Sequence, residues 1–302
     1  MSQLDHISVC ICTYKRPDLL RQLLVKLQNQ QTGGLFEYSI VVVDNDSVES
    51  ARQTIESIMR QTRISLKYYV QPEQNISLAR NMTVLHATGR YVAFIDDDES
   101  PADEWLLRMY LALLKYGADG VFGPVEPVFS VEPPQWMVEA GLFDRPSYAK
   151  TGSVINWRQT GMGNVLVRRS VLDEVRGPFQ REFGSGGEDV DFFRRATGMG
   201  KVFVWCGEAT VFETVPAERI RLFFQLKRAL LRGKASLAHP SGRAFGIVKS
   251  LTAFLLYTVL LPVFFVMGRH VFVRYLIKDF DHIGKLLAAC RLDLVKEKYV
   301  LK

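Results

Sequence analysis

The feature that most constrains the fold of this chain is an alternation of short apolar runs with helix-like segments over residues 7–116. The apolar, β-branched runs predict buried strands at residues 7–13, 39–43, 66–70 and 91–95. The segments that follow them predict helices at residues 17–27, 48–60, 77–86 and 101–116, with Ser77 as the cap of the third. Such an alternation indicates a mostly parallel sheet that is covered by helices on both faces.

Polar clusters follow three of the four predicted strands directly, at residues 13–14, 44–46 and 96–98. The carboxyl ends of parallel strands meet at one edge of a sheet, and ligands of α/β proteins bind there. We therefore expect the three clusters to converge on one site.

The third cluster consists of three successive carboxylates, Asp96, Asp97 and Asp98. Their mutual repulsion would be relieved by a divalent cation that prefers oxygen ligands, Mg²⁺ or Mn²⁺, which could also bridge a diphosphate. The alternative is a solvated turn whose acids cap the helix that begins near Pro101. The residues alone leave both interpretations open.

Two other segments contain candidate functional groups. Asp44, with its neighbours at 45–46, offers acceptors for a nucleobase and ribose hydroxyls, or forms an Asx turn. The glycine-rich residues 184–187 lead into Glu188 and Asp189, where a carboxylate could act as a general base. The alternative is that these acids only stabilise the start of a helix over residues 188–197.

The charge balance limits the expected partners. A formal net charge of +6 and a pI of about 9.1 favour anionic partners such as phosphorylated substrates, anionic lipid or nucleic acid. The basic residues gather beside an apolar segment near the carboxyl end and not on a recognition helix, so we expect no nucleic-acid binding.

The second half of the chain is less regular. Residues 122–129, 165–167 and 201–205 predict strands, and residues 219–243 form a basic amphipathic stretch. Residues 250–268 contain no charge and are just long enough to span a bilayer, but Pro262 interrupts them and basic residues flank both ends. A re-entrant or monotopic insertion with both ends cytoplasmic reconciles these facts. A buried core helix and a full span are the alternatives.

The amino-terminal residues 1–6 are polar and lack the basic-then-apolar pattern of a secretory leader. The four cysteines show neither a zinc-binding pair nor a disulfide framework. We therefore expect the amino-terminal part of the chain to be cytoplasmic.

Five blocks of sequence support a resemblance to a known family. They are ISVCICTYKRP, SIVVVDNDS, QNISLARNMTVLHATGRYVAFIDDDESP, GMGNVLVRRSVLDEVRGPF and GGEDVDFFRRATGMG. In this order and spacing, from about Ile7 to Glu213, the chain resembles the family 2 glycosyltransferases of GT-A fold. The resemblance implies a GT-A catalytic domain at residues 1–215, with a nucleotide-binding half at 1–100 and an acceptor half at 101–215. Residues 216–302 would be a helical, membrane-associated appendage.

The resemblance also implies roles on the donor side. Thr13 and Tyr14 would line the nucleotide pocket, Asp44 would read the base, usually uracil, and Arg80 would contact the diphosphate.

For the acidic turn, the resemblance implies a D-x-D pair. Asp98 would be the direct ligand of Mn²⁺ or Mg²⁺ and Asp96 would lie nearer the ribose. Asp97 would be a spacer in this cofactor-binding turn.

On the acceptor side, the resemblance implies that Asp189 is the catalytic base of an inverting displacement. Gly163 and Asn164 would enter the acceptor-side strand, and Glu188 would lie beside the base.

Processive members of the family have a Gln-x-x-Arg-Trp motif, where this chain has Ala229 in place of the Trp. We therefore expect addition of one sugar per encounter. The expected donor is a nucleotide sugar, and the expected acceptor is a glycan or lipid-linked saccharide of bacterial surface-glycan synthesis. The expected location is the cytoplasmic face of the plasma membrane. The alternatives are a metal-dependent nucleotidyltransferase and a non-enzymatic, membrane-peripheral binding protein.

Overall fold

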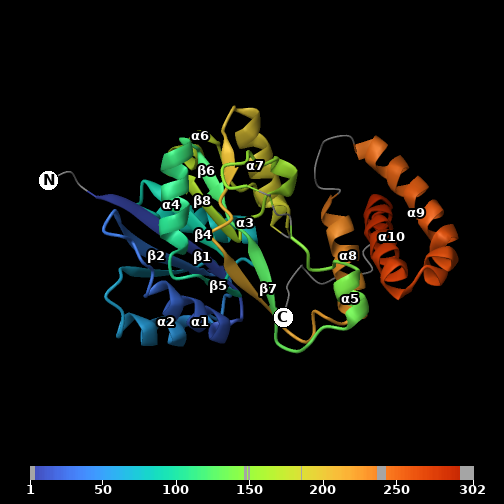
Figure 1. The fold of residues 1–302 in the computed structure, drawn as a ribbon, viewed down its shortest axis with the longest axis horizontal. Helices are drawn as coiled ribbons and strands as arrows, with labels where there is room; N and C mark the ends of the chain where they lie inside the picture. Colours follow the sequence, from blue (N-terminus) through green and yellow to red (C-terminus); the bar gives the residue numbers. More distant parts are fainter. Residues whose placement is uncertain (1–3, 146–147, 149, 185, 237–242, 293–302) are drawn as a thin grey trace.

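A seven-stranded sheet in the order β3-β2-β1-β4-β8-β6-β9 forms the centre of the protein (Figure 1). The computed structural model describes residues 4–145, 148, 150–184, 186–236 and 243–292. The strands of this sheet are β1 (Asp5–Thr13), β2 (Phe36–Asp44), β3 (Leu66–Val70), β4 (Tyr91–Ile95), β6 (Gly120–Phe122), β8 (Asn164–Arg168) and β9 (Phe203–Trp205). Strands β3, β2, β1 and β4 are parallel, and β8 is antiparallel to both β4 and β6. The predicted mostly parallel, mixed sheet is confirmed.

The strand register places the polar clusters at one edge. Thr13, the last residue of β1, pairs with Asp44, the last residue of β2. On the other side of β1, Cys10 pairs with Phe94 of β4, so the residues that follow Ile95 lie at the same edge. This edge is where the chain leaves all three strands.

Helices cover both faces of the sheet, and alternate residues of the strands point into two separate apolar layers. One layer lies under α1 (Pro17–Leu27), α2 (Arg52–Met59) and α4 (Trp105–Tyr116). The other lies under α3 (Ile76–His86), α6 (Arg169–Glu174) and α7 (Glu188–Gly198). Because both faces are buried, the central strands are apolar at nearly every position instead of alternating.

Three predicted helix starts were wrong, and one of them is that of α2, which begins at Arg52 and not at Val48. The side chain of Asn75, and not that of Ser77, caps α3 by accepting a hydrogen bond of 3.1 Å from the backbone N–H of Leu78. Helix α4 begins at Trp105 and not near Pro101, because residues Glu99–Pro101 form the short strand β5.

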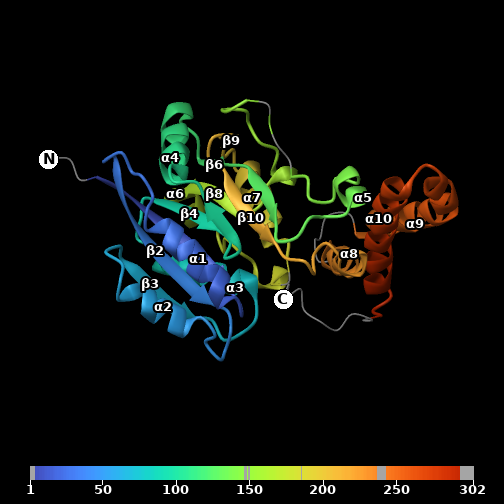
Figure 2. The same cartoon turned by 60° about the horizontal axis from the view of Figure 1, so that its bottom comes forward.

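A second, three-stranded sheet in the order β5-β10-β7 lies beside the first (Figure 2). It contains β5, β7 (Val125–Phe129) and β10 (Val211–Val215). The single strand expected at 122–129 is therefore two strands, β6 and β7, in different sheets. Gly123 lies at the break, where a Cβ atom would approach the carbonyl oxygen of Ala209 to 2.1 Å. Shorter elements connect the sheets: α5 (Gln135–Glu139) and the 3₁₀ turns η1 (Trp157–Gln159) and η2 (Arg181–Phe183).

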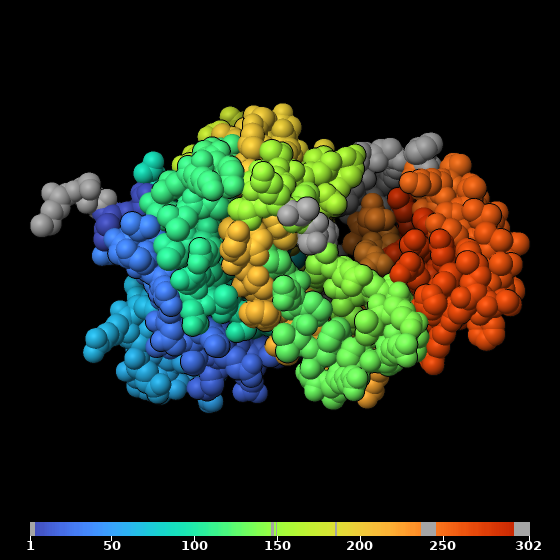
Figure 3. Space-filling view, in the orientation of Figure 1, coloured from blue at the N-terminus to red at the C-terminus, as the bar shows by residue number. Residues whose placement is uncertain are grey.

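The carboxyl-terminal region consists of α8 (Leu222–Ser236), α9 (Arg243–Val266) and α10 (Arg269–Ala289). These helices form a lobe on one side of the sheet-containing body, in which α8 lies nearest the body and α9 farthest from it (Figures 1 and 3). Arg274 of α10 attaches the lobe to α5 by donating to the carbonyl oxygen of Ala140 at 3.0 Å.

Helix α9 is long and apolar enough to cross a membrane over Gly246–Val266, and only 6% of this apolar window is buried. The side chain of Val259 is 74% exposed and that of Phe265 is 65% exposed. A buried core helix, one of the alternatives from the sequence, does not agree with this exposure.

Candidate functional site

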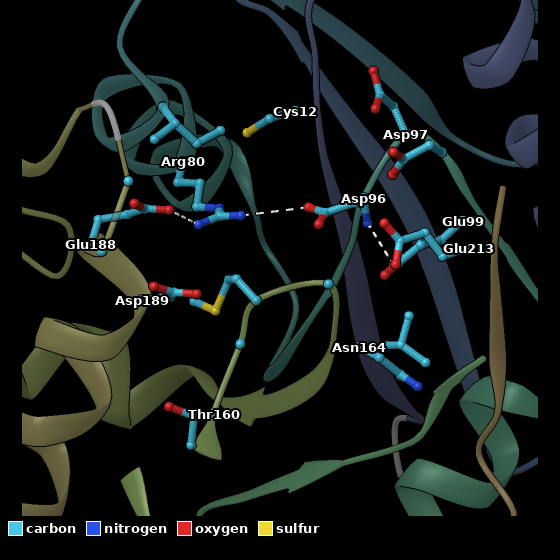
Figure 4. A pocket seen from close by; sticks show the side chains of 18 of the residues that line it. Cys12, Arg80, Asp96, Asp97, Glu99, Thr160, Asn164, Glu188, Asp189 and Glu213 are labelled. Atoms are coloured by element: carbon cyan, nitrogen blue, oxygen red, sulfur yellow. Dashed lines mark hydrogen bonds and ion pairs between the residues drawn. The ribbon is translucent and has the colours of Figure 1, made fainter. Parts of the chain in front are cut away.

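A cavity of about 700 Å³, called here the main cavity, opens at the carboxyl ends of β1, β2 and β4. Tyr14, Asn45 and Asp96, one residue from each polar cluster, line it. Residues 159–164 and 186–189 form its opposite side (Figure 4), and α8 contributes basic residues to the wall. The convergence expected from the sequence is confirmed.

Asp97 is a hydrogen-bonded anchor of the acidic turn and not a mere spacer. Its carboxylate accepts a hydrogen bond of 2.8 Å from the Thr13 hydroxyl and one of 2.9 Å from the Arg16 guanidinium. Burial raises the pKa of Asp97 to about 6, although Arg16 opposes the shift. These bonds join the turn to the end of β1.

Asp98 is buried against two arginines. One oxygen, Oδ2, accepts from Arg219 at 2.7 Å and from Arg16 at 3.1 Å. Arg219 also donates to Glu213 at 2.8 Å, and Arg145 forms a second ion pair with Glu213. The repulsion expected within the acidic turn is therefore relieved by arginines of the protein itself.

Asp96 points into the main cavity and its side chain is 48% exposed (Figure 4). Its backbone N–H donates to the buried Glu99 carboxylate at 2.9 Å. Its own carboxylate lies 3.5 Å from Arg80, and Arg80 forms a close ion pair with Glu188 across the cavity. Arg80 thus lies between two carboxylates, one from the donor side and one from the start of α7.

The carboxylates of the acidic turn fit a divalent cation only in part. Mg²⁺ and similar ions often bind through one or two carboxylates, with water and substrate phosphates as the other ligands. Asp96 is accessible for this, and Asp98 offers the oxygen that the arginines do not hold. No group of three or more His, Cys, Asp or Glu in the described parts of the chain is arranged to hold a metal ion. A cation at this turn would therefore need further ligands from water or a bound diphosphate.

Asp44 is fully buried and its carboxylate faces the protein. It accepts hydrogen bonds from the backbone N–H groups of Asp46 and Ala51, at 3.1 and 2.9 Å, and from the Tyr68 hydroxyl at 3.0 Å. Burial raises the pKa of Asp44. Its neighbour Asn45 lines the cavity instead. A carboxylate can accept about four hydrogen bonds, and three of these positions on Asp44 are occupied. Contact between Asp44 and a base stays a prediction, and it would have to use the fourth position.

Asp189 lies in the first turn of α7 and lines the main cavity opposite Asp96 (Figure 4). Gly187, with φ of 92°, turns the chain into the helix. Asp189 Oδ1 accepts from the backbone N–H of Val190 at 2.7 Å, and Oδ2 lies 4.0 Å from where a Cβ of Gly161 would be. The second oxygen can therefore face a substrate.

Gly163 and Asn164 lie at the entry to β8, as expected, but the two residues have different roles. A Cβ at Gly163 would approach Glu99 Oε1 to 2.4 Å, so the glycine lets the chain pass the acidic turn. The buried Asn164 side chain donates to Pro124 and Ala209 carbonyl oxygens and accepts from the Trp105 indole. Asn164 thus connects segments of the two sheets. Because most of its hydrogen-bonding positions are occupied within the protein, few remain for a sugar acceptor.

Sequence reasoning missed the arginine and glutamate pairs that surround the acidic turn. Glu99, Glu213, Arg145 and Arg219 all line the main cavity. Burial, followed by the charge of Asp96, raises the pKa of Glu99 well above its usual range. No local signal could have found them, because the arginines that pair with Glu213 lie outside its strand, β10.

Comparison with known proteins gives a consistent assignment. The sequence model of "Glycosyl transferase family 2" matches residues 8–176. The succinoglycan biosynthesis protein ExoM of Rhizobium meliloti is 33% identical over 80% of this chain and 79% of its own length. The glycosyltransferase AglE of Haloferax volcanii is 31% identical over 66% of this chain and 64% of its own length.

Solved structures show a similar fold. Residues 1–349 of S. aureus TarS, in complex with UDP-GlcNAc, align over 97% of this chain and 93% of that chain, with a TM-score of 0.57 and 17% identity. In another TarS structure the alignment covers 93% of this chain but 55% of that chain, with a TM-score of 0.56.

Proposed function

The chain belongs to glycosyl transferase family 2, and from this premise we propose that it moves one sugar from a UDP-sugar to a hydroxyl group of a lipid-linked or other glycan acceptor. A role in bacterial surface-glycan synthesis agrees with the succinoglycan relative. A UDP-sugar donor agrees with the ligand of the structurally similar TarS. Both findings favour sugar transfer over nucleotidyl transfer or simple binding.

The observation that carries the proposal is the position of Asp189. This carboxylate lies across the main cavity from the acidic turn, so a sugar donor at the strand ends would present its anomeric carbon between them (Figure 4). A general base and a leaving group on opposite sides of the reacting carbon are what an inverting displacement requires.

In the proposed reaction, Asp189 removes the proton from the acceptor hydroxyl. The hydroxyl oxygen then attacks the anomeric carbon, and the bond from that carbon to the UDP oxygen breaks with inversion. Asp96 and Asp98 would hold Mn²⁺ or Mg²⁺, which when bound neutralises negative charge on a departing nucleotide diphosphate. Arg80, held by Asp96 and Glu188, fixes the distance between the donor side and the base side.

Transfer of one sugar per encounter has support from α8. Gln225 donates to the backbone carbonyl oxygen of Arg219 at 2.6 Å, and Arg228 lines the main cavity. Ala229, at the position of the Trp in processive members, is fully buried against Val273 and Ile277 of α10. A tryptophan has no space there, because α8 and α10 pack closely at this point.

Membrane association through the carboxyl-terminal lobe is part of the proposal. Helix α9 presents an apolar surface, and α8 and α10 carry basic residues beside it. A helix of this kind binds an anionic membrane through both apolar burial and charge. The catalytic body would then face the cytoplasm, where nucleotide sugars are available.

A donor screen tests the proposed function. Purified full-length protein is incubated with UDP-, GDP- and TDP-sugars, with Mn²⁺, Mg²⁺ or EDTA, and nucleotide diphosphate release is measured. We expect release from one UDP-sugar and its loss in EDTA. No release from any donor, with or without a glycan acceptor, would refute the proposal.

A further inference from the structure

A second cavity, of about 270 Å³, lies between α8, α9 and α10. We call it the lobe cavity. Its lining includes Arg232 of α8, Lys249 of α9, and His282 and Lys285 of α10, with Asp281 as the acid. Basic groups from three helices therefore meet in one hollow.

The positive charge of this cavity is only partly compensated. Arg232 is paired with Asp281 through two hydrogen bonds, so that carboxylate is already used. The His282 ring lies 3.2 Å from the Ser250 hydroxyl. Lys249 and Lys285 have no carboxylate partner among the described residues. An anion is the ligand that would relieve their repulsion.

Glycines shape the lobe cavity. Cβ atoms at Gly233 and Gly284 would lie 2.0 and 2.2 Å from backbone oxygens of the facing helix, so α8 and α10 can meet only because both residues are glycine. A Cβ at Gly246 would lie 2.9 Å from Lys285 Nζ. The Lys285 ammonium thus lies close to the backbone of α9, at the lining of the lobe cavity.

The surroundings of the lobe cavity indicate what kind of anion it would hold. Arg232 and Ser236 line both this cavity and the main cavity, so the two are adjacent. On the other side, Lys249 lies at the start of the exposed apolar surface of α9, where Leu255 is 56% and Val259 is 74% exposed. A ligand that extends from the sugar-transfer site through the lobe cavity would continue along an apolar surface.

We propose that the lobe cavity binds the phosphate or diphosphate of a lipid-linked acceptor, with Lys249 and Lys285 as its main ligands. The sugar end of this acceptor would reach the main cavity past Arg232, and its hydrocarbon chain would follow α9. The inference rests on the proposed function, which it deepens by naming the chemical class of the acceptor.

The test measures flotation of the full-length protein with vesicles. Phosphatidylcholine vesicles that contain a polyprenyl diphosphate are compared with vesicles brought to the same surface charge by phosphatidylglycerol. We expect tighter binding to the polyprenyl diphosphate. Lys285→Gln should weaken this binding about tenfold, the effect of losing one hydrogen bond between charged groups. Lys285→Arg should retain it, which separates loss of charge from loss of folding.

The matched control is Lys278→Gln, which removes the same charge from the same helix outside the lobe cavity. Equal weakening by Lys278→Gln and Lys285→Gln, or no preference over phosphatidylglycerol, would overturn the inference. Binding of free inorganic diphosphate as tight as that of the lipid, and equally dependent on Lys285, would also overturn it in favour of a soluble anion.

Donor turnover separates this inference from the proposed function. Release of UDP from the sugar donor without acceptor does not require a lipid phosphate in the lobe cavity. Normal release together with loss of lipid selectivity would refute only the lobe cavity, whereas absence of release from every donor would refute the proposed function.

Discussion

Replacement of Arg219 by glutamine tests how the acidic turn is held in place. Arg219 is 3% exposed and donates to Asp98 at 2.7 Å and to Glu213 at 2.8 Å. The glutamine variant leaves two buried carboxylates with one cation fewer. The ion pair of Arg16 with Asp98 and that of Arg145 with Glu213 remain in the variant.

The expected loss can be estimated from these contacts. Removal of one partner of a buried ion pair costs about 3–5 kcal/mol, because the remaining charge is left without compensation. Since Arg16 and Arg145 still compensate part of it, we expect a loss of about 3 kcal/mol in the free energy of unfolding. The double variant Arg219→Gln/Glu213→Gln should lose less than the sum of the two single variants, because one carboxylate disappears with its cation.

Urea unfolding followed by circular dichroism measures this loss. Arg221→Gln is the control, since Arg221 is exposed two residues away and its replacement should change stability by about 0.5 kcal/mol or less. A loss for Arg219→Gln no greater than that of the control would refute the claim that Arg219 neutralises the turn.

Three further predictions concern other parts of the structure. The pKa of Glu99 is raised by burial, so the folded state holds a proton that the unfolded state releases, and stability should fall as pH rises above about 4.5. The melting temperature of the wild type, measured across pH, should show this fall. Glu99→Gln should remove it. A melting curve of Glu99→Gln with the same pH dependence as wild type would contradict this. Gly163→Ala should lower the free energy of unfolding in urea by about 1–3 kcal/mol, because its Cβ would lie 2.4 Å from Glu99. Gly161→Ala should lower it less, since its Cβ would lie 4.0 Å from the nearest side chain. Equal losses would count against the close approach of Gly163 to Glu99. Val259→Glu on α9 should reduce co-sedimentation with anionic vesicles. Val48→Glu, at a residue of nearly equal exposure on the catalytic body, should not reduce it. Equal binding of both variants would exclude α9 as the membrane surface.

The parallel part of the fold could be predicted because each of its elements has a local signal. Strands β3 and β4 occur at the predicted residues, and α1 begins at Pro17 with its leucines facing the sheet. The meeting of the three polar clusters follows from the topology alone, since parallel strands of one sheet end at one edge.

Strand β10 could not be predicted, because its pattern contradicts the usual rule for strands. Its buried face contains Glu213 between Val211 and Val215, while Phe212 on the other face is exposed. A buried glutamate is compatible with a strand only where cations face it, and these come from Arg145 and Arg219 in other segments. No local pattern reports such contacts.

The same limitation explains the roles within the acidic turn. The resemblance implies that Asp97 is a spacer and that Asp98 is the direct metal ligand. In the structure Asp97 is held by Thr13, 84 residues earlier, and Asp98 by Arg219, 121 residues later. Asp96 is the most exposed of the three carboxylates. Pairings over such distances depend on how the two sheets pack.

Asp189 is proposed to remove the acceptor proton in a sugar transfer. The most direct test compares sugar transfer by wild type and by Asp189→Asn, with the donor identified in the screen. The control is Asp173→Asn, which removes an exposed carboxylate outside the main cavity. We expect Asp189→Asn to bind UDP as wild type does and to transfer about 10²–10⁴-fold more slowly, since that is the range for loss of a general base. Transfer by Asp189→Asn at the wild-type rate would show that Asp189 is not the general base.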